Sequence, residues 1–271
     1  MIIDSHAHIG ILPPFHMTAD DLLYSMERYC IDFSLISNIE GAENDHLGNP
    51  VPPQWQTPQN ELLRKTLEIA RKAPEKLGVL PWLRIRQELP DAGFIKLIKE
   101  NRDIVYGLKL HPFHSLTAPD DPKLEPVYEL AAELRLPVVS HTGGCEEAMS
   151  IHLYNAAKRH PEIDFVMVHM DLGTDNKAAL DLLGKLPNLY GDTTWVPVAT
   201  AVEAIRRYGS KKMLFGTDNP IDGKDTLLHN KTGDRSLYQQ YFNELKELIS
   251  EDDYEDLMWR NAARLFSINI S

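Results

Sequence analysis

Short apolar runs alternate with amphipathic stretches along almost the whole chain. The runs cover residues 2–6, 31–38, 77–85, 104–112, 136–144, 164–170, 188–195 and 212–218. Between them, apolar residues recur every three or four positions, as in "ADDLLYSMERYC" at 19–30 and "TAVEAIRRYG" at 200–209, which is the spacing of amphipathic helices. Apolar strands that alternate with helices are typical of a parallel sheet covered on both faces. The pattern predicts an α/β fold of eight strand–helix units.

Eight units between residues 2 and 218 favour a (β/α)8 TIM barrel over an open doubly wound sheet. No glycine-rich GxGxxG follows the first strand, where a dinucleotide-binding fold would place it. The stretch 250–268 is expected to be a capped amphipathic helix that closes the barrel. No repeat or linker divides the chain, so we expect a single TIM-barrel domain over residues 1–271.

Two connections are longer than a plain barrel needs. Residues 39–59 follow the second strand and residues 219–237 follow the eighth. Both come after the carboxyl ends of strands, which is the face where barrel enzymes keep their sites. Solvated surface loops and segments that line a binding site are equally compatible with this placement.

Composition narrows the possible partners and location. Acidic residues outnumber basic ones by 40 to 28, which gives a formal charge of −12 and argues against nucleic acid or an anionic membrane as partner. No stretch approaches the roughly 20 apolar residues that cross a bilayer, and no secretory signal is recognised at the N-terminus. The two cysteines, Cys30 and Cys145, form no CxxC pair. We therefore expect a cytoplasmic protein that acts on a small molecule.

The first predicted strand ends in "DSHAH" at 4–8. Because side chains alternate between the two faces of a strand, His6 and His8 point the same way, with Asp4 below them. Two imidazoles on one face at the rim of an apolar strand suit a bound cation. The alternative is a pair of hydrogen-bonded histidines at a strand end.

Further candidate ligands fall at the ends of later strands. They are Lys109 and His111 after the fourth strand, His141 after the fifth, His169 after the sixth and Asp218 after the eighth. Since the carboxyl ends of barrel strands meet at one face, we expect these side chains to converge. His114, one register off, is expected to face solvent.

The candidate ligands suit a catalytic divalent metal. Neutral imidazoles with a carboxylate are ligands of Zn²⁺ and related first-row ions. Such an ion lowers the pKa of a bound water from about 16 toward 7. Asp218 can contact the metal and accept the proton of that water, while His169 can polarise a substrate oxygen or protonate a leaving group.

The motifs taken together resemble a known family. "DSHAH" at 4–8, "VVSHTGG" at 138–144, "VMVHM" at 166–170 and "LFGTDNP" at 214–220 resemble the amidohydrolase superfamily. "RNAARLF" at 260–266 resembles more narrowly its amidohydrolase-2 branch, which also contains decarboxylases and hydratases. The resemblance runs from residue 1 to the last helix. It implies a metal-dependent barrel enzyme and, as a family-level expectation, a homodimer.

The resemblance also implies ligand roles. His6, His8 and Asp218 would hold the more buried ion. In members with one ion, the residue at the position of His141 joins them and the residue at the position of His169 does catalytic work. In members with two ions, these last two positions hold the second ion.

Lys109 and His111 have two possible roles each. In two-ion members a strand-four lysine carries CO₂ as a carbamate and bridges both ions, and "GLKLHP" places Lys109 at that position. Lys109 can instead stay a cation that binds a substrate carboxylate. His111 lies further toward the mouth, where it would contact substrate or donate a hydrogen bond to another site residue.

We expect a metal-dependent hydrolase in which activated water attacks the carbonyl of an amide, lactone or ester. The alternative is a non-hydrolytic lyase, a decarboxylase or hydratase of an unsaturated carboxylic acid, which would use the free cation of Lys109. A barrel that serves only as a binding protein would lack at least one ligand position, and none is missing.

Overall fold

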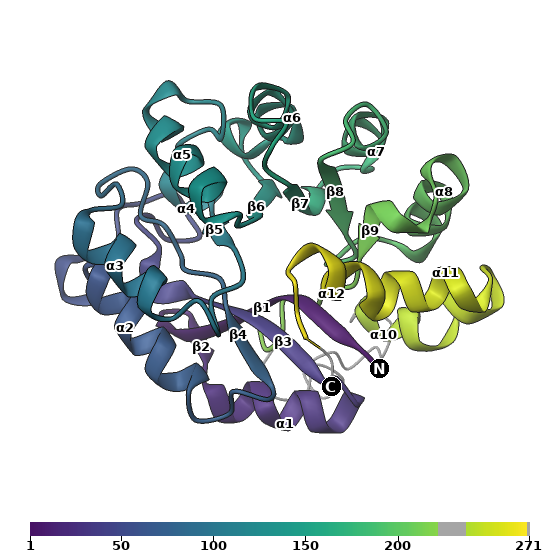
Figure 1. Cartoon of the computed structure of the whole chain (residues 1–271), viewed down its shortest axis with the longest axis horizontal. Coiled ribbons are helices and arrows are strands. Elements are labelled where there is room, and N and C mark those ends of the chain that lie inside the picture. The colour runs from purple at the N-terminus through teal and green to yellow at the C-terminus, as the bar shows by residue number, and fades with distance from the viewer. Residues whose placement is uncertain (222–236, 270–271) are drawn as a thin grey trace.

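All eight predicted strands are present and carry helices on their outer side, as the computed structural model of the chain shows (Figure 1). The structure describes residues 1–221 and 237–269. The strands are β1 (Ile3–Leu12), β2 (Phe15–Met17), β3 (Phe33–Asn38), β4 (Leu77–Val79), β5 (Leu108–Leu110), β6 (Val138–Gly143), β7 (Phe165–Leu172), β8 (Leu189–Asp192) and β9 (Met213–Leu214).

The helices follow the predicted amphipathic stretches closely. They are α1 (Ala19–Tyr29), α2 (Gln59–Ala70), α3 (Ala92–Glu100), α4 (Pro112–Ser115), α5 (Glu125–Leu134), α6 (Ser150–Arg159), α7 (Lys177–Leu183), α8 (Val198–Tyr208), α10 (Leu237–Asn243), α11 (Glu251–Glu255) and α12 (Asn261–Leu265). A π-helical turn at Asp256–Arg260 joins α11 to α12. The short elements β2, α4 and α10 were not predicted, because three to seven residues carry too little periodicity to be recognised.

The strands form two sheets that meet at both edges. One has the order β2-β1-β3-β4 and the other β5-β6-β7-β8-β9, and all neighbours are parallel except the β1–β2 hairpin. Parallel bridges Val79–Val105 and Trp82–Lys109 join β4 to β5. At the other edge Ala7 bridges Asn219, and the His8 amide donates to the Asn219 carbonyl at 2.9 Å. The chain therefore has the predicted TIM-barrel fold.

Side chains on the two faces of the strands belong to separate apolar clusters. Along β7, Phe165 and Met167 pack with the surrounding helices, whereas Val166 and Val168 belong to an inner cluster. This alternation is the period of a strand. The inner cluster also contains Ala262, Phe266 and Ile268 from the C-terminal segment, which lies beside the start of β1 (Figure 1).

The C-terminal helix begins at a side-chain cap, as predicted. The Ser250 hydroxyl accepts a hydrogen bond from the Asp253 amide at 3.2 Å. Further along, the Asn261 side chain donates to the carbonyls of Ser210 and Met213, both at 2.8 Å. These bonds hold the helix against the beginning of β9, so that Phe266 reaches the inner cluster.

The first long connection packs against the barrel. Within 39–59, Ile39, Ala42 and Val51 are buried in a third apolar cluster together with Trp82. The guanidinium of buried Arg84 donates to the Thr57 carbonyl at 2.5 Å. Of the second connection, 219–237, residues 222–236 lie outside the described residues.

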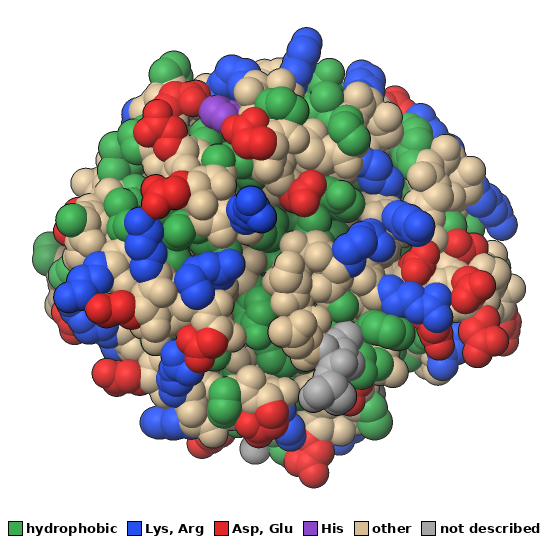
Figure 2. Space-filling view, in the orientation of Figure 1, with side chains coloured by type: hydrophobic (Ala, Val, Ile, Leu, Met, Phe, Trp, Pro, Cys, Tyr) green, Lys and Arg blue, Asp and Glu red, His purple; other side chains and the backbone are tan. Residues whose placement is uncertain are grey.

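The visible surface carries charged side chains of both signs. On the face seen in Figure 2, acidic and basic side chains are interspersed, with no large basic field. Across 1–221 and 237–269, no helix combines the length and the hydrophobicity that a bilayer crossing requires.

Truncating Phe266 tests the role of the C-terminal segment. The side chain is 3% exposed, and Phe266→Ala should lower the free energy of unfolding by about 3–5 kcal/mol because it leaves a cavity in the inner cluster. Urea unfolding followed by circular dichroism measures the loss. Leu248→Ala, at a side chain 48% exposed, is the control and should change it by less than about 0.5 kcal/mol. Equal losses in both variants would contradict the assignment.

Candidate metal centre

His6, His8 and Asp218 meet where the last strand returns to the first. His8 Nε2 lies 3.1 Å and His6 Nε2 3.6 Å from Asp218 Oδ1, and all three residues are buried. The Asp218 amide donates to the His6 carbonyl at 2.9 Å, so the barrel closure itself brings the carboxylate to the two imidazoles. Trp195 Nε1 donates to Asp218 Oδ2 at 3.0 Å, which leaves Oδ1 facing the histidines.

His169 completes a compact group of ligand atoms. One ligand atom each from His6, His169 and Asp218 lies within 4.8 Å of the others. His169 Nδ1 donates to the Thr194 carbonyl at 3.2 Å. Because a carbonyl only accepts, the proton of the neutral ring is on Nδ1, and Nε2 keeps its lone pair for a cation.

The other two imidazoles also have a partner on Nδ1. His8 Nδ1 shares a hydrogen bond with the Ser37 hydroxyl at 3.0 Å, and His6 Nδ1 shares one with the Thr194 hydroxyl at 3.4 Å. Such partners fix the orientation of a metal-binding ring. Partners on Nδ1 therefore hold all three rings, while Nε2 of His8 lies against Asp218 and Nε2 of His6 lies against Lys109.

The protonation states suit a divalent cation. Burial lowers the pKa of His169 to about 4, and burial with the charge of Lys109 holds the pKa of His6 well below its usual range. Burial acts to raise the pKa of Asp218, but the hydrogen bond with His8 and the nearby imidazoles hold it well below its ordinary value. At neutral pH the rings of His6 and His169 are neutral and the Asp218 carboxylate is ionised, which are the forms that bind metal. The donor set fits Zn²⁺ or a related ion.

Lys109 lies directly beside this group. Its side chain is fully buried on β5, and Nζ is 2.9 Å from His6 Nε2. Burial lowers the pKa of Lys109 to about 8, against the opposing effect of Asp218 and Asp192. The position agrees with both roles considered above, a ligand between two ions and a cation for a substrate carboxylate.

His141 and His111 lie next to the group and form a stack with Trp82. The rings of His111 and His141 are 4.2 Å apart and nearly parallel, and Trp82 stacks on His111 at 4.7 Å. His141 Nε2 donates to the Gly143 carbonyl at 3.2 Å. The Nδ1 atoms of His111 and His141 are buried and have no hydrogen-bond partner among the described residues. The structure thus groups His169, rather than His141, with His6 and Asp218.

A small pocket opens above the candidate ligands. Its volume is about 160 Å³. It is lined by His8, Phe15, Met17, Ile39, His46, His111, Phe113, His114, His141, Gly144, His169, Leu172, Asp218 and Ile221. Ile39 and His46 come from the first long connection, which therefore contributes to the site.

The expectation for His114 was wrong. Its side chain is buried, and Nδ1 donates to the Asn44 carbonyl at 2.7 Å. The short helix α4 turns the chain directly after β5, so the register of the preceding strand no longer applies and His114 packs 4.5 Å from the ring of His111.

Three residues that support the site were missed from the sequence. Buried Asp192, at the end of β8, accepts hydrogen bonds from the His169 amide at 3.0 Å and from the Thr194 hydroxyl at 2.8 Å. The rule that located the histidines, a polar residue at a strand end, would have found it. Trp82 and Thr194 carried no comparable signal, because their roles depend on contacts between distant strands.

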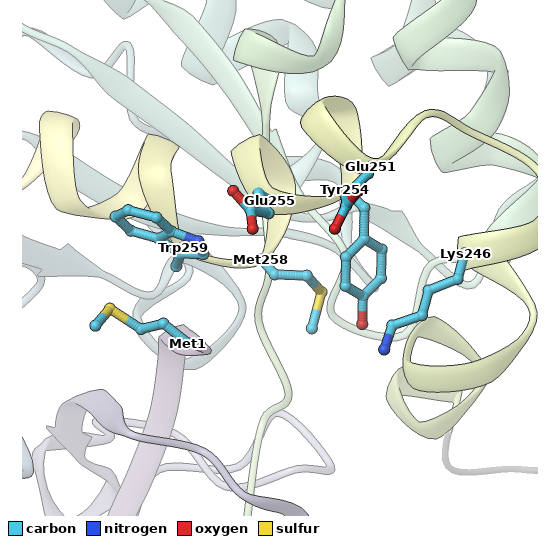
Figure 3. Close-up of a pocket in the computed structure, with 7 residues that line it drawn as sticks. All are labelled: Met1, Lys246, Glu251, Tyr254, Glu255, Met258 and Trp259. Atoms are coloured by element: carbon cyan, nitrogen blue, oxygen red, sulfur yellow. The ribbon is translucent and has the colours of Figure 1, made fainter.

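A cavity of about 390 Å³ lies against the N-terminus, away from the histidines (Figure 3). Met1, Lys246, Glu251, Tyr254, Glu255, Met258 and Trp259 line it. Met1 precedes β1, so this cavity is at the opposite end of the barrel from the candidate metal centre. Its donors do not form a metal-binding group among the described residues.

Comparison with known proteins gives a family match over most of the chain. The family model described as "Amidohydrolase" matches residues 3–268. No match was found among the sequences of curated proteins.

Solved structures share the fold at low sequence identity. The 2,6-dihydroxybenzoate decarboxylase from Rhizobium is 16% identical, with a TM-score of 0.70 and 98% of each chain covered. The 5-carboxyvanillate decarboxylase from Sphingomonas paucimobilis is 14% identical, with a TM-score of 0.71 and 99% of each chain covered. The 4-oxalomesaconate hydratase from Rhodopseudomonas palustris is 17% identical, with a TM-score of 0.67, covering 98% of this chain and 96% of that one.

Removing His6 and His8 tests the metal centre. The double variant His6→Ala/His8→Ala should bind less than about a tenth of the metal held by the parent protein, because two of the convergent imidazoles are lost. Metal content per chain is measured by plasma mass spectrometry on untagged protein, and circular dichroism checks the fold. His16→Ala, at an exposed histidine on β2, should retain the metal. Full metal content in the double variant would disprove the site.

His114 should make stability depend on pH. Burial lowers its pKa from 6.5 to about 4, so the unfolded chain binds the extra proton first. The stability contribution is therefore complete above pH 6.5 and is lost as pH falls toward 4, by up to about 3 kcal/mol. Urea unfolding of metal-free protein across this range should show a smaller decline for His114→Gln than for His16→Gln. Identical declines would contradict the prediction.

Proposed function

Because the chain belongs to the amidohydrolase-2 family, we propose that it is a metal-dependent enzyme that removes CO₂ from a small unsaturated carboxylic acid. The observation that carries the proposal is the position of the buried ligand group beneath a small, largely apolar pocket. Within the family, this proposal favours the lyase alternative over the hydrolase expected from the sequence.

The size of the pocket suits one ring or an equally small planar body. A volume of about 160 Å³ is close to that of a cavity that holds benzene, about 150 Å³. Phe15, Phe113 and Leu172 supply apolar walls, and the Trp82–His111–His141 stack gives the same region a planar side. A flat, conjugated acid matches these surfaces better than a branched amide.

Apolar walls also favour the reaction itself. Decarboxylation converts a charged carboxylate into neutral CO₂, and an environment that solvates charge poorly favours that change. When bound, the divalent ion supplies positive charge that binds the carboxylic acid and stabilises negative charge on the reacting carbon.

The chain's own residues would orient the acid and move the proton. Nδ1 of His111, which has no partner within residues 1–221 and 237–269, can hydrogen-bond to a polar group of the substrate. As the bond between carbon and the carboxyl group breaks, its electron pair stays on the carbon, and CO₂ leaves. The carbon then takes a proton from Asp218, which first accepts one from a water molecule because its carboxylate is ionised, and His169 lies beside it. The hydroxide that remains combines with the released CO₂ as bicarbonate. Lys109 would serve as the buried cation that balances the carboxylate.

Names of proteins with similar structures support this choice. Two of the three compared above are decarboxylases whose named substrates carry a carboxyl group on an aromatic ring. The third is a hydratase. At 14–17% identity these structures share the fold with this chain.

Hydrolysis is the second candidate, and one observation favours it. Lys109 Nζ lies 2.9 Å from His6 Nε2, where a carbamate bridging two ions would begin. The number of ions per chain separates the candidates, because decarboxylation as proposed keeps Lys109 unmodified.

The first experiment measures ions per chain and CO₂ release together. Protein loaded with Zn²⁺ or Mn²⁺ is incubated with benzoates bearing hydroxyl groups and with open-chain unsaturated acids. We expect about one ion per chain and release of CO₂ from at least one acid. Asp218→Asn should lower kcat at least about 100-fold, while Asp45→Asn, in the first long connection, should not.

Two ions per chain, hydrolysis of lactones or amides and no CO₂ release would overturn the proposal. The predicted homodimer and cytoplasmic location are independent of this outcome and stay predictions.

A further inference from the structure

Three consecutive residues at the end of β7 adopt a left-handed backbone conformation. His169, Met170 and Asp171 have φ values of 69°, 49° and 69°. Residues other than glycine rarely adopt this conformation, and three in a row cost energy that the surroundings must offset. Such an arrangement persists only where neighbouring groups hold it in place. Here it directs the ring of His169 into the ligand group.

Hydrogen bonds from three sides hold the left-handed turn. The His169 amide donates to Asp192 Oδ1, and the Asp171 amide donates to the Thr142 hydroxyl, both at 3.0 Å. The Asn176 side chain donates to the carbonyls of His169, at 3.2 Å, and Met170, at 2.8 Å. Asn176 therefore holds the two backbone carbonyls on either side of the Met170 side chain.

The Asn176 side chain does not cap the helix that follows it. It precedes α7 as the N-cap residue, where the side-chain oxygen ordinarily accepts a hydrogen bond from the first turn of the helix. Its side chain makes no such bond. The amide is directed to the turn instead, and the residue is 5% exposed. The side chain of Asn176 thus makes two hydrogen bonds to the left-handed segment in place of a helix cap.

We propose that Asn176 is a positioning residue for His169. By holding the two carbonyls, it keeps the left-handed turn in the conformation that lets His169 Nδ1 donate to Thr194 and leaves Nε2 facing His6 and Asp218. Without the amide, the backbone of residues 169–171 relaxes toward ordinary angles, and the Cα–Cβ bond of His169 then points in a different direction. The ring no longer reaches the Thr194 carbonyl and loses its fixed tautomer. The effect on catalysis rests on the proposed function, whereas the effect on the ring does not.

Two variants remove the N–H donor and introduce residues that tolerate the positive φ of this position. Asn176 has a φ of 59°, which glycine accepts readily, so Asn176→Gly deletes the side chain cleanly. Asn176→Asp keeps the size and the tolerance of positive φ but has no N–H to donate. If the glycine variant fails to fold, the aspartate variant decides.

Asn188 provides a matched control. It is equally buried, at 5% exposed, and its side chain donates to the carbonyls of Ala157, His160 and Ile163. It precedes β8, at the end of the strand away from the site. Asn188→Gly removes the same atoms and a similar set of bonds, so a loss of stability alone affects both variants alike.

The readout is the tautomer of His169 in metal-free protein. Histidine-labelled protein is studied by long-range proton–nitrogen NMR, and the His169 signals are identified by their loss in His169→Gln. We expect one tautomer, protonated on Nδ1, in the parent and in Asn188→Gly. In Asn176→Gly and Asn176→Asp the two ring nitrogens should shift toward a common average, and affinity for Zn²⁺ should fall about 10–100-fold.

A single Nδ1-protonated tautomer and parental Zn²⁺ affinity in both Asn176 variants would overturn the inference. If an acid substrate is found, kcat should fall in the Asn176 variants with little change in KM, while Asn188→Gly keeps both. If the ring changes as expected but no acid is decarboxylated by the parent, the proposed function fails and the role of Asn176 stands.

Discussion

Closure of the barrel is the constraint on which the site depends. The last strand must meet the first, and it does so through Ala7–Asn219 and through the hydrogen bond from the Asp218 amide to the His6 carbonyl. The same contact sets the distance between the Asp218 carboxylate and the two β1 imidazoles. The ligand geometry therefore depends on how the last strand pairs with the first, because a shift in that strand register would also move Asp218 away from His6 and His8.

Burial determines the chemistry of these side chains. In a dry environment a charged imidazole is costly, so His6 and His169 stay neutral, and the ionised Asp218 is retained by its histidine partners. The backbone and side chain of Thr194 and the hydroxyl of Ser37 occupy Nδ1 of the three rings. The rings are thereby held in place before any ion is bound, which reduces the cost of binding one.

Further hydrogen bonds hold the residues that surround the candidate metal centre. Asp192 bonds both the His169 amide and Thr194, and Asn176 bonds the turn that carries His169. A strained backbone segment thus receives support from β8 and from the start of α7. The pocket above combines this rigid floor with apolar walls drawn from several connections, and variation in those connections could change the substrate without disturbing the ligand group.

The sequence by itself determined the barrel, its eight strands and the candidate ligands, because strand periodicity and strand ends are local properties that apolar runs and neighbouring residues report directly. It also showed that His6 and His8 share a face. Only the tertiary structure showed that a ligand atom of His169 lies close to those of His6 and Asp218, that His114 is buried, and that Trp82, Asp192 and Asn176 contact residues of the site. Those outcomes depend on contacts between residues tens of positions apart. They also depend on the positive φ angles of residues 169–171, which no local sequence pattern predicts.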